Sequence, residues 1–486
     1  MGVAPIFDRG LMNSSSIRGR FTILLLGLLV SGCTVGPHYR KPVVQIPDAY
    51  HDPTNQATEE AAGVQPQAPS YADLPWWEVF QDPALQKLIQ QALAHNYDLQ
   101  IATERINAGR AQLVITRADQ FPQVTADAGG TDGRFFQGGF ASRSKYATYA
   151  ADATFQLDLW GKYRRATEAA RAQLLGTEYA QKTTILTLVS DTASDYFALL
   201  ALDLQLQITR GTIANQQDAV KLTNLRMERG VATKLDVLQA QQVLDTANAQ
   251  LPELEREIGQ LEDAISILVG DFPRAVARGK PLVEQPLPPD IPAGLPSALL
   301  ARRPDISQAE QNLIAANAEI GVAKAAFFPQ VALTGSGGGA AGQATLLSSM
   351  ISSTVGIWSY GLNIAQPIFE AGRLRGNVRL AESQQRQQLI AYQQAIKWAF
   401  RDVSDALIGH DKYHDVRQKQ EVMVNDLQES VETSLMRYRG GIATYLEVLD
   451  GQRSLFNAEL TLAQARGNEY QSVVQLYKAL GGGWQK

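Results

Sequence analysis

The side chains best suited to chemistry lie in three places along the 486-residue sequence. His410 and His414 are four residues apart with Asp411 between them, a spacing that can place metal ligands on one helix face. No third ligand follows at a recognised spacing, so a solvated helix is the better interpretation. The glycine-rich run from Gly335 to Gly342 could be taken for a phosphate loop, but it lacks the following Lys-Ser/Thr pair. We interpret it as a loop between two strands, and we predict no enzyme, no metal site and no cofactor.

The third place is Cys33, the only cysteine of the chain. Two arginines precede an apolar run, Phe21–Val30, which is too short to span a bilayer as a helix but fits the core of a secretory signal peptide. Because Cys33 stands at the small-residue cleavage point, Val30-Ser-Gly-Cys33 resembles a bacterial lipobox. We predict that Cys33 becomes the first residue and carries N-palmitoyl and S-diacylglycerol groups, with Thr34 resembling the outer-membrane sorting type. The alternative is a plain cleavage site beside an unrelated cysteine.

Long helices must position the remaining side chains. From Gly372 to Leu480 the sequence has no proline, and its apolar residues step by three or four, as a packed helix face requires. We predict one arm over 373–439, ~100 Å long at 1.5 Å per residue, and a second arm from Thr444. The predicted apolar seams carry Val424, Leu427, Val431 and Leu435 on the first arm, and Leu446, Leu449, Phe456 and Leu460 on the second.

The turn between these arms occurs twice. Gly230 and Thr233 match Gly441 and Thr444 at a constant offset, and a similar proline-free arm over 162–229 precedes the first copy. Glycine takes the positive φ that ends a helix. Two helices of this length are far longer than usual globular helices. The chain is therefore an internal duplication.

A helix and a strand pair precede each helical hairpin. Phe121-Pro-Gln-Val124 aligns with Phe328-Pro-Gln-Val331, and the helix before the second copy is predicted to begin at Asp305, an N-cap residue with Gln308 three positions on. After each of these two Phe-Pro-Gln-Val segments apolar and polar residues alternate. This period of two predicts strands with one apolar face and one solvated face.

Strands of this kind, with aromatic residues toward one end, are typical of a transmembrane β-barrel. The alternative for any single hairpin is an ordinary half-buried sheet, but two hairpins in equivalent places favour the barrel. Four strands cannot close a barrel, and open edges are not tolerated in lipid. The barrel must then be shared between chains.

A net charge of −5 and five histidines give no indication of a nucleic-acid-binding surface. The features described above define the domain organisation. The predicted segments are a signal peptide at 1–32, an extended segment at 33–80, a first repeat at 81–280 with its β-hairpin at 121–160 and helical hairpin at 161–270, a proline-rich connector at 281–304, and a second repeat at 305–482 with its β-hairpin at 328–369 and helical hairpin at 372–482.

Several motifs together resemble one family, the outer membrane factors of tripartite efflux and secretion systems. They are Cys33-Thr-Val-Gly-Pro, Trp77 with Phe80 and Asp82-Pro-Ala-Leu85, Gly294-Leu-Pro-Ser297, Leu299-Leu-Ala-Arg-Arg-Pro-Asp-Ile306 and both Gly-x-x-Thr turns. The resemblance is closest to the lipoprotein branch that serves resistance–nodulation–division (RND) pumps. It implies a mixed α and transmembrane β fold: a homotrimer whose twelve-stranded β-barrel, four strands per chain, continues into a long α-helical coiled-coil tunnel in the periplasm.

The resemblance also implies partners. A periplasmic adaptor (membrane fusion protein) and an inner-membrane RND transporter would assemble with the trimer, and outer-membrane lipid would surround the barrel. The adaptor would dock at the tips of the helical hairpins, which carry Gly230, Thr233, Gly441 and Thr444.

A periplasmic gate is implied at the second turn. Tyr438 matches the family's aromatic constriction residue, and Glu447 and Asp450 match acidic rings that favour cations in a narrow pore. Ala443 stands where some members have a basic residue, so their salt-bridge latch is not expected. The alternative is that Glu447 and Asp450 are solvated acids stabilised by the helix dipole.

The implied function is the exit duct of a tripartite efflux system, lipid-anchored and inserted in the cell outer membrane, which passively conducts what the pump delivers. Two alternatives are an outer membrane factor of a type I protein secretion system and a periplasmic coiled-coil adaptor, which would lack the strand hairpins. The sequence does not identify the exported compound.

Overall fold

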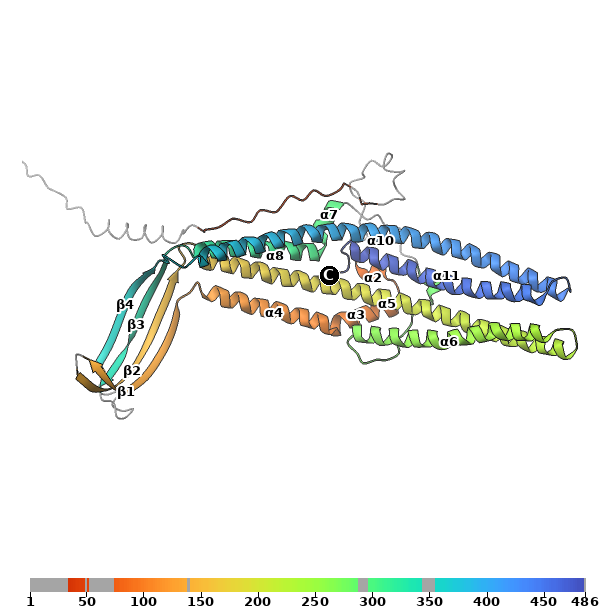
Figure 1. The fold of residues 1–486 in the computed structure, drawn as a ribbon, viewed down its shortest axis with the longest axis horizontal. Coiled ribbons are helices and arrows are strands. Elements are labelled where there is room, and N and C mark those ends of the chain that lie inside the picture. The colour runs from red at the N-terminus through yellow and green to blue at the C-terminus, as the bar shows by residue number, and fades with distance from the viewer. Residues whose placement is uncertain are drawn as a thin grey trace, which may run out of the picture. The chain divides into compact units, whose positions relative to one another are not determined.

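The computed structural model describes residues 34–48, 50–51, 74–137, 140–286, 296–342 and 355–484. The predicted signal peptide and Cys33 lie outside these residues. The chain divides into two compact units, whose elements are labelled in Figure 1. The first unit holds the chain up to Pro42 with Asn107–Leu175 and Glu310–Ala391, and the second holds Val43–Ile106, Gly176–Ala309 and Tyr392–Lys486.

The first unit contains a four-stranded antiparallel sheet in the order β1-β2-β3-β4. β1 (Gln123–Gln137) pairs with β2 (Phe140–Leu157), and β3 (Gln330–Gly342) pairs with both β2 and β4 (Val355–Ala365). Both predicted strand hairpins are therefore present, and β2 and β3 join them into one sheet. β1 and β4 are its two edges.

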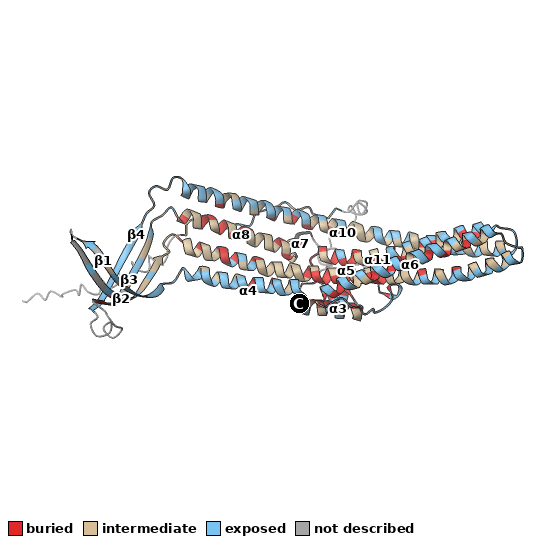
Figure 2. Cartoon of the chain, turned by 60° about the horizontal axis from the view of Figure 1, so that its bottom comes forward, coloured by how far each residue is buried: buried red, intermediate tan, exposed pale blue. Residues whose placement is uncertain are grey.

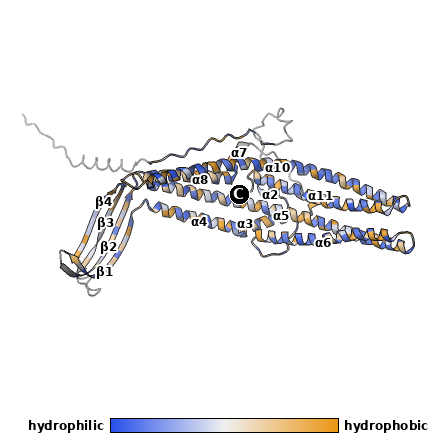
Figure 3. Ribbon diagram, viewed as in Figure 1, coloured by the Kyte–Doolittle hydropathy of each residue, from blue (hydrophilic) through white to orange (hydrophobic). Residues whose placement is uncertain are grey.

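The register places most of the large apolar residues of the four strands on one face. Figure 3 colours the strands by the hydropathy of each residue. One transverse row consists of Val124, Ala153, Gly335 and Tyr360, and an adjacent row on the opposite face consists of Thr125, Asp152, Ser336 and Ser359. On the apolar face the rings of Trp358 and Tyr360 stack at 5.8 Å, and their side chains are 76% and 83% exposed. Large exposed aromatic groups on one sheet face match the outward face of a membrane barrel.

The prediction that Gly335–Gly342 is a loop is wrong, because these residues form most of β3. Their backbone pairs with β2 on one side and with β4 on the other. A Cβ atom on Gly338 would lie 2.0 Å from the carbonyl oxygen of Tyr149, so this strand approaches its neighbour more closely than a side chain would permit. Glycine here marks close backbone approach rather than a turn.

Helices adjoin the strands in the sequence. α4 (Tyr97–Ala118) precedes β1, α5 (Lys162–Glu228) follows β2, α8 (Pro304–Ala325) precedes β3 and α10 (Arg373–Arg439) follows β4. In the first unit Gln120 donates to the backbone of Tyr163 at 3.3 Å, next to the end of α4, and Lys324 of α8 lies 3.6 Å from Glu382 of α10. The side chain of Arg165 on α5 lies against Gly321 of α8, so the helix order α4, α5, α8, α10 repeats the strand order.

An N-terminal strap, residues 34–41, packs on α5 and α8 within the first unit. Val35 N–H donates to the carbonyl oxygen of Trp160 at 3.0 Å, and Asn317 donates to the carbonyl oxygen of Pro37 at 3.0 Å. Gly36 has a φ of +106°, and a Cβ atom there would lie 2.5 Å from Cα of Gly321. The two glycines permit the strap to cross α8 at backbone contact.

The second unit contains α2 (Trp76–Val79), α3 (Pro83–His95), α6 (Lys234–Leu268), the 3-10 turn Leu282–Glu284, α7 (Pro296–Arg302), α11 (Tyr445–Ala479) and parts of the longer helices. Its buried residues are coloured red in Figure 2. Within the described residues α5 is the helix whose length and composition would allow a membrane crossing, but 61% of its most apolar window is buried, as expected in a helix bundle.

A buried carboxylate organises this core. Asp82 is the N-cap of α3 and accepts from Ala84 N–H at 2.8 Å and from the Tyr196 hydroxyl at 2.8 Å. Gln285, beyond α6, also donates to it. Because a buried charge needs such partners, Asp82 ties α3, α5 and the connector together.

The long helices α5 and α10 agree closely with the predicted arms. One predicted N-cap residue and one predicted seam residue are wrong. α8 begins at Pro304, so Asp305 lies inside the first turn and is not the N-cap; its carboxylate binds Arg303 at 2.6 Å instead. Leu446 is 57% exposed and does not belong to the packed seam of α11, whereas Leu449 and Phe456 are buried. Tyr445 and Val448 occupy the buried positions near Leu446.

Candidate functional site

The two predicted tips share one backbone construction. After α5, Gly230 has a φ of +73°, its N–H donates to the Met227 carbonyl and Val231 N–H donates to the Arg226 carbonyl at 2.8 Å. After α10, Gly441 has a φ of +74°, and Ile442 N–H donates to the Arg437 carbonyl at 2.9 Å. These paired bonds form a Schellman motif, which requires a left-handed residue at the glycine position.

The threonines of both tips begin the following helix. Thr233 and Thr444 are the N-caps of α6 and α11. The Thr233 hydroxyl oxygen accepts from Asp236 N–H at 3.2 Å, while Asp236 accepts from Thr233 N–H at 2.7 Å, which completes a capping box. In the second copy Glu447 accepts from both the N–H and the hydroxyl of Thr444 at 3.2 Å. The four predicted tip residues therefore stop one helix and start the next.

The tips also expose apolar side chains. Val231 and Ile442, which follow the two glycines, are 66% and 75% exposed. Leu235 and Leu446 lie one residue after the start of their helices and are exposed as well. The two copies thus present the same pair of apolar positions at equivalent places.

Tyr438 packs between the two helical hairpins. Its ring lies 5.1 Å from the ring of Tyr445, and the Arg226 guanidinium lies over it at 4.6 Å. Tyr445 belongs to a buried cluster with Ala240, Val448 and Leu449, against which Tyr438 and Leu435 pack. Burial raises the pKa of Tyr445, so this phenol stays neutral. Arg226 therefore connects α5 to the end of α10 through a cation–π contact.

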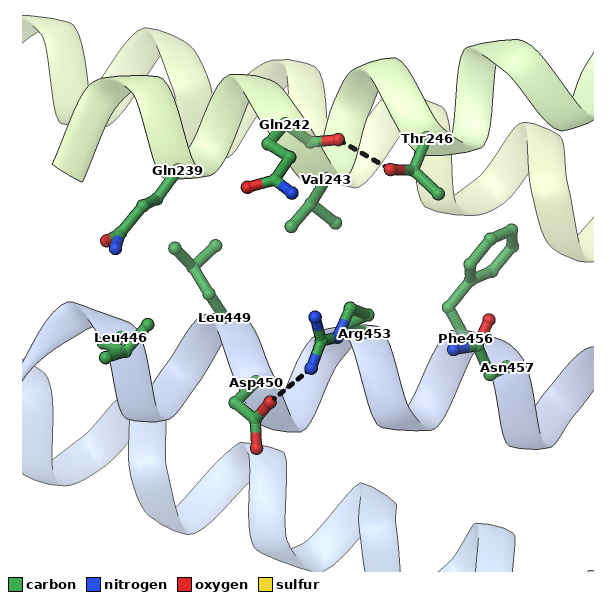
Figure 4. Close-up of a pocket in the computed structure, with 10 residues that line it drawn as sticks. All are labelled: Gln239, Gln242, Val243, Thr246, Leu446, Leu449, Asp450, Arg453, Phe456 and Asn457. Atoms are coloured by element: carbon green, nitrogen blue, oxygen red, sulfur yellow. Dashed lines mark hydrogen bonds and ion pairs between the residues drawn. The ribbon is translucent and has the colours of Figure 1, made fainter. Parts of the chain in front are cut away.

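Glu447 and Asp450 lie on the exposed side of α11 but have different partners. Glu447 is engaged in the capping box, whereas Asp450 pairs with Arg453 at 2.9 Å. Figure 4 shows Asp450 and Arg453 at a groove between α6 and α11, with Leu449 directed toward α6. The groove also includes Gln239, Gln242, Val243, Thr246, Leu446, Phe456 and Asn457.

The histidine pair faces α11. His414 Nδ1 lies 2.8 Å from the carboxylate of Glu469, and His410 Nδ1 lies 3.3 Å from the hydroxyl of Ser472. Glu469 is buried and also lies 2.6 Å from Arg417. In the part of the chain that the structure describes, no group of three or more His, Cys, Asp or Glu side chains is placed to hold a metal ion.

Sequence reasoning did not identify Glu469 or Arg226 as structural features, and it predicted the strap as part of the extended segment at 33–80 without its contacts to the helices. Glu469 had a weak signal, because it is the only charged residue between Gly467 and Leu476, a stretch that is largely buried. Arg226 gave no signal, since nothing local distinguishes it from the other basic residues near the helix end.

The family model for outer membrane efflux proteins matches residues 88–271 and 295–482. The cation efflux system protein CusC of Escherichia coli O6:H1 (strain CFT073) is 33% identical over 464 residues, which cover 95% of this chain and 98% of that protein. The solvent efflux pump outer membrane protein SrpC of Pseudomonas putida is 35% identical, covering 96% of this chain and 97% of its own length.

A solved structure agrees with the fold. The open state of the MtrE outer membrane channel of Neisseria gonorrhoeae superposes with a TM-score of 0.80 at 29% identity and covers 93% of this chain and 99% of that one. The matched residues include both helical hairpins and both strand hairpins of this chain. The chain belongs to the outer membrane efflux protein family and is an outer membrane efflux channel.

Proposed function

We propose that three copies of this chain form the exit duct of a tripartite efflux system, in which a periplasmic adaptor and an inner-membrane RND transporter deliver the substrate. The duct conducts passively and catalyses no reaction. The names of CusC and SrpC refer to different substrates, cations and solvents, and the two proteins are almost equally identical to this chain. The comparisons therefore favour no substrate class.

The open sheet carries this proposal. β1 and β4 have no further strand partner among the described residues, and unpaired strand edges are not stable within lipid. The helices next to the edge strands also expose apolar residues, Val114 and Ile115 on α4 and Leu380 and Ile390 on α10. If β1 and α4 of one copy pair with β4 and α10 of the next, both edges are covered around a closed ring.

Barrel size supports three copies. Four strands per chain give eight, twelve or sixteen strands for two, three or four copies. About eight strands leave room only for side chains in the interior, so twelve is the smallest number with an open passage. Native mass spectrometry of the detergent-extracted protein should give three chains. A folded, membrane-inserted monomer would contradict the proposal.

The tips are the proposed adaptor-docking sites, because the capped turns are rigid and expose apolar side chains that a helical partner can cover. Ile442→Glu with Val231→Glu should weaken cross-linking to the adaptor and reduce efflux, because the charges must be buried on docking. The trimer should persist, since both side chains are exposed. A matched control is Val422→Glu, an exposed position in the interior of α10. Undiminished cross-linking of the tip variant would place the docking site elsewhere.

Tyr438, Glu447 and Asp450 are the proposed periplasmic gate. Single-channel recordings separate this role from helix capping. Glu447→Gln retains an oxygen that can accept from Thr444 but removes the charge, and Asp450→Asn does the same for the second position. Together they should lower cation selectivity without changing the trimer. Asp236→Asn in the first copy is the matched control. An unchanged reversal potential would leave Glu447 with a capping role alone.

The last element of the proposal is the lipid anchor on Cys33. The strap supports it, because residues 34–41 are fixed on α5 and α8 within the unit that contains the sheet. A diacylated residue directly before the strap would then insert in the membrane beside the barrel.

A further inference from the structure

The apolar face of the sheet ends in charged residues that the proposed conduit does not use. On β2 this face consists of Leu157, Phe155 and then alternate residues to Ala147. Those from Ala153 to Ala147 pair with alternate residues of β1 from Val124 to Gly130. The next positions of the same parity on β1 are Asp132 and Arg134, and Arg143 of β2 lies opposite Arg134 in the register. The lipid-facing side of the hairpin therefore changes from apolar to charged within one pair of residues.

The charged positions form a defined cluster. The Arg143 guanidinium donates to both carboxylate oxygens of Asp132, at 2.9 Å from Nε and 2.8 Å from Nη2. The Arg143 side chain is 74% exposed and retains further N–H donors, because a guanidinium has five. Arg134 is exposed, and no ion pair or hydrogen bond joins its side chain to any of the residues that the structure describes. Arg143 is thus paired with Asp132, and Arg134 lies opposite Arg143 in the register.

The distance along β2 places this cluster beyond the hydrocarbon layer. Arg143 lies fourteen residues from Leu157 on the same strand. At about 3.4 Å per residue this separation is ~48 Å along the strand, and a tilt of about 40° reduces it to ~36 Å along the membrane normal. The apolar band of an outer-membrane barrel is only about 25 Å tall. The arginines therefore lie at headgroup level.

The connectivity decides which leaflet is involved. β1 follows α4 and β2 leads into α5, so the helix-adjoining end of the sheet is the periplasmic end. The end of β1 at Gln137 and the start of β2 at Phe140 lie at the other end, beside Arg134 and Arg143. The cluster therefore faces the outer leaflet of the outer membrane, which contains phosphorylated glycolipid.

We propose that Arg134 and Arg143 bind the phosphorylated headgroup of an outer-leaflet glycolipid, lipid A of lipopolysaccharide. Guanidinium groups bind phosphate oxygens through paired, charge-assisted hydrogen bonds. Two guanidinium groups on neighbouring strands match a headgroup with two phosphates, and the Asp132 carboxylate competes with a phosphate for Arg143. The apolar rows below would contact the acyl chains. The inference rests on the proposed closure of the sheet into a barrel, because closure turns this face toward lipid.

Native mass spectrometry of the full-length trimer tests the proposal. The delipidated protein is titrated with bisphosphorylated lipid A, with dephosphorylated lipid A and with phosphatidylglycerol. Arg134→Gln with Arg143→Gln should weaken binding of bisphosphorylated lipid A by about tenfold or more, because the paired charged hydrogen bonds are lost. The matched control, Arg375→Gln with Arg379→Gln on α10, should bind as the unaltered protein does.

Two further variants keep the test decisive if the double variant does not fold. Arg134→Gln alone removes a side chain without a described partner and should weaken binding of bisphosphorylated lipid A by itself. Asp132→Asn should strengthen that binding, because it removes the competing carboxylate. Equal binding of dephosphorylated lipid A or of phosphatidylglycerol would overturn the assignment, as would unchanged binding in the arginine variants. Loss of the trimer in the unaltered protein would instead refute the proposed assembly.

Discussion

Replacing Thr233 by alanine tests how the tips are built, because the two copies of the turn differ in one contact. The Thr233 hydroxyl oxygen accepts from the Asp236 amide at 3.2 Å. In the second copy the Glu447 amide instead donates to the backbone carbonyl of Thr444, at 3.3 Å. Both threonines belong to a capping box. Thr444→Ala leaves the Glu447 amide with this backbone acceptor, whereas Thr233→Ala removes the acceptor of the Asp236 amide.

The size of the effect follows from the cap. Loss of a threonine N-cap costs about 1 kcal/mol, with a range of about 0.5–2 kcal/mol, and 1 kcal/mol is about fivefold in an opening equilibrium. We expect the Asp236 amide to exchange with solvent about fivefold faster in Thr233→Ala. The Glu447 amide should change less in Thr444→Ala.

Hydrogen exchange followed by mass spectrometry, with fragments that separate the two tips, measures both amides in the same trimer. Exchange in the interior of α6 and α11 provides the internal reference and should not change. Equal acceleration at Asp236 and Glu447 would show that the two caps are equivalent and would refute the reasoning from this single contact.

Three other predictions concern different parts of the chain. Gly36→Ala should expose residues 34–41 to proteolysis, because its Cβ would lie 2.5 Å from Gly321, whereas Gly376→Ala, which has open space around it, should not. Burial raises the pKa of Glu459 above the ordinary 4.5, so the folded state loses stability as the pH rises from 4.5 through the raised pKa. Glu459→Gln should therefore raise the denaturation midpoint at pH 7 and leave it unchanged at pH 3. An equal gain at both pH values would contradict this prediction. Cys33→Ser should abolish labelling by radioactive palmitate, and retained labelling would refute the lipid anchor.

The long helices and their turns could be predicted because their signals are local. α10 spans Arg373–Arg439 as the sequence predicts, since 67 residues without proline and with a helical apolar period leave few alternatives. The ends at Gly230 and Gly441 follow from the left-handed conformation that glycine readily adopts. The strand hairpins followed from alternation with period two.

The errors arose where tertiary contacts decided the outcome. The glycine run of β3 has the composition of a loop, and only pairing with β2 and β4 makes it a strand. Asp305 has the residue type of an N-cap, but the competing charge of Arg303 takes its carboxylate. Leu446 fits the seam period, yet Tyr445 and Val448 occupy the packed positions. Local pattern does not specify which of several compatible partners is present.

The candidate site was predictable only in part. The tip residues are explained by local chemistry, whereas Tyr438, Glu447 and Asp450 stay predictions as a gate, because that role depends on the distance between equivalent residues of different copies. The Arg226 contact with Tyr438 joins residues 212 positions apart in the sequence, a separation at which periodicity carries no information.

The N-terminal strap has a consequence for the order in which the chain folds. Its hydrogen-bond partner Asn317 is 280 residues away from Pro37, and the acidic partner of Lys41 is 269 residues away. During vectorial synthesis and export the strap emerges first, yet α8 becomes available only after the whole first repeat has followed. Contacts of such high sequence separation form late because loop closure must precede them. The residues that leave the export machinery earliest are thus among the last to reach their native positions.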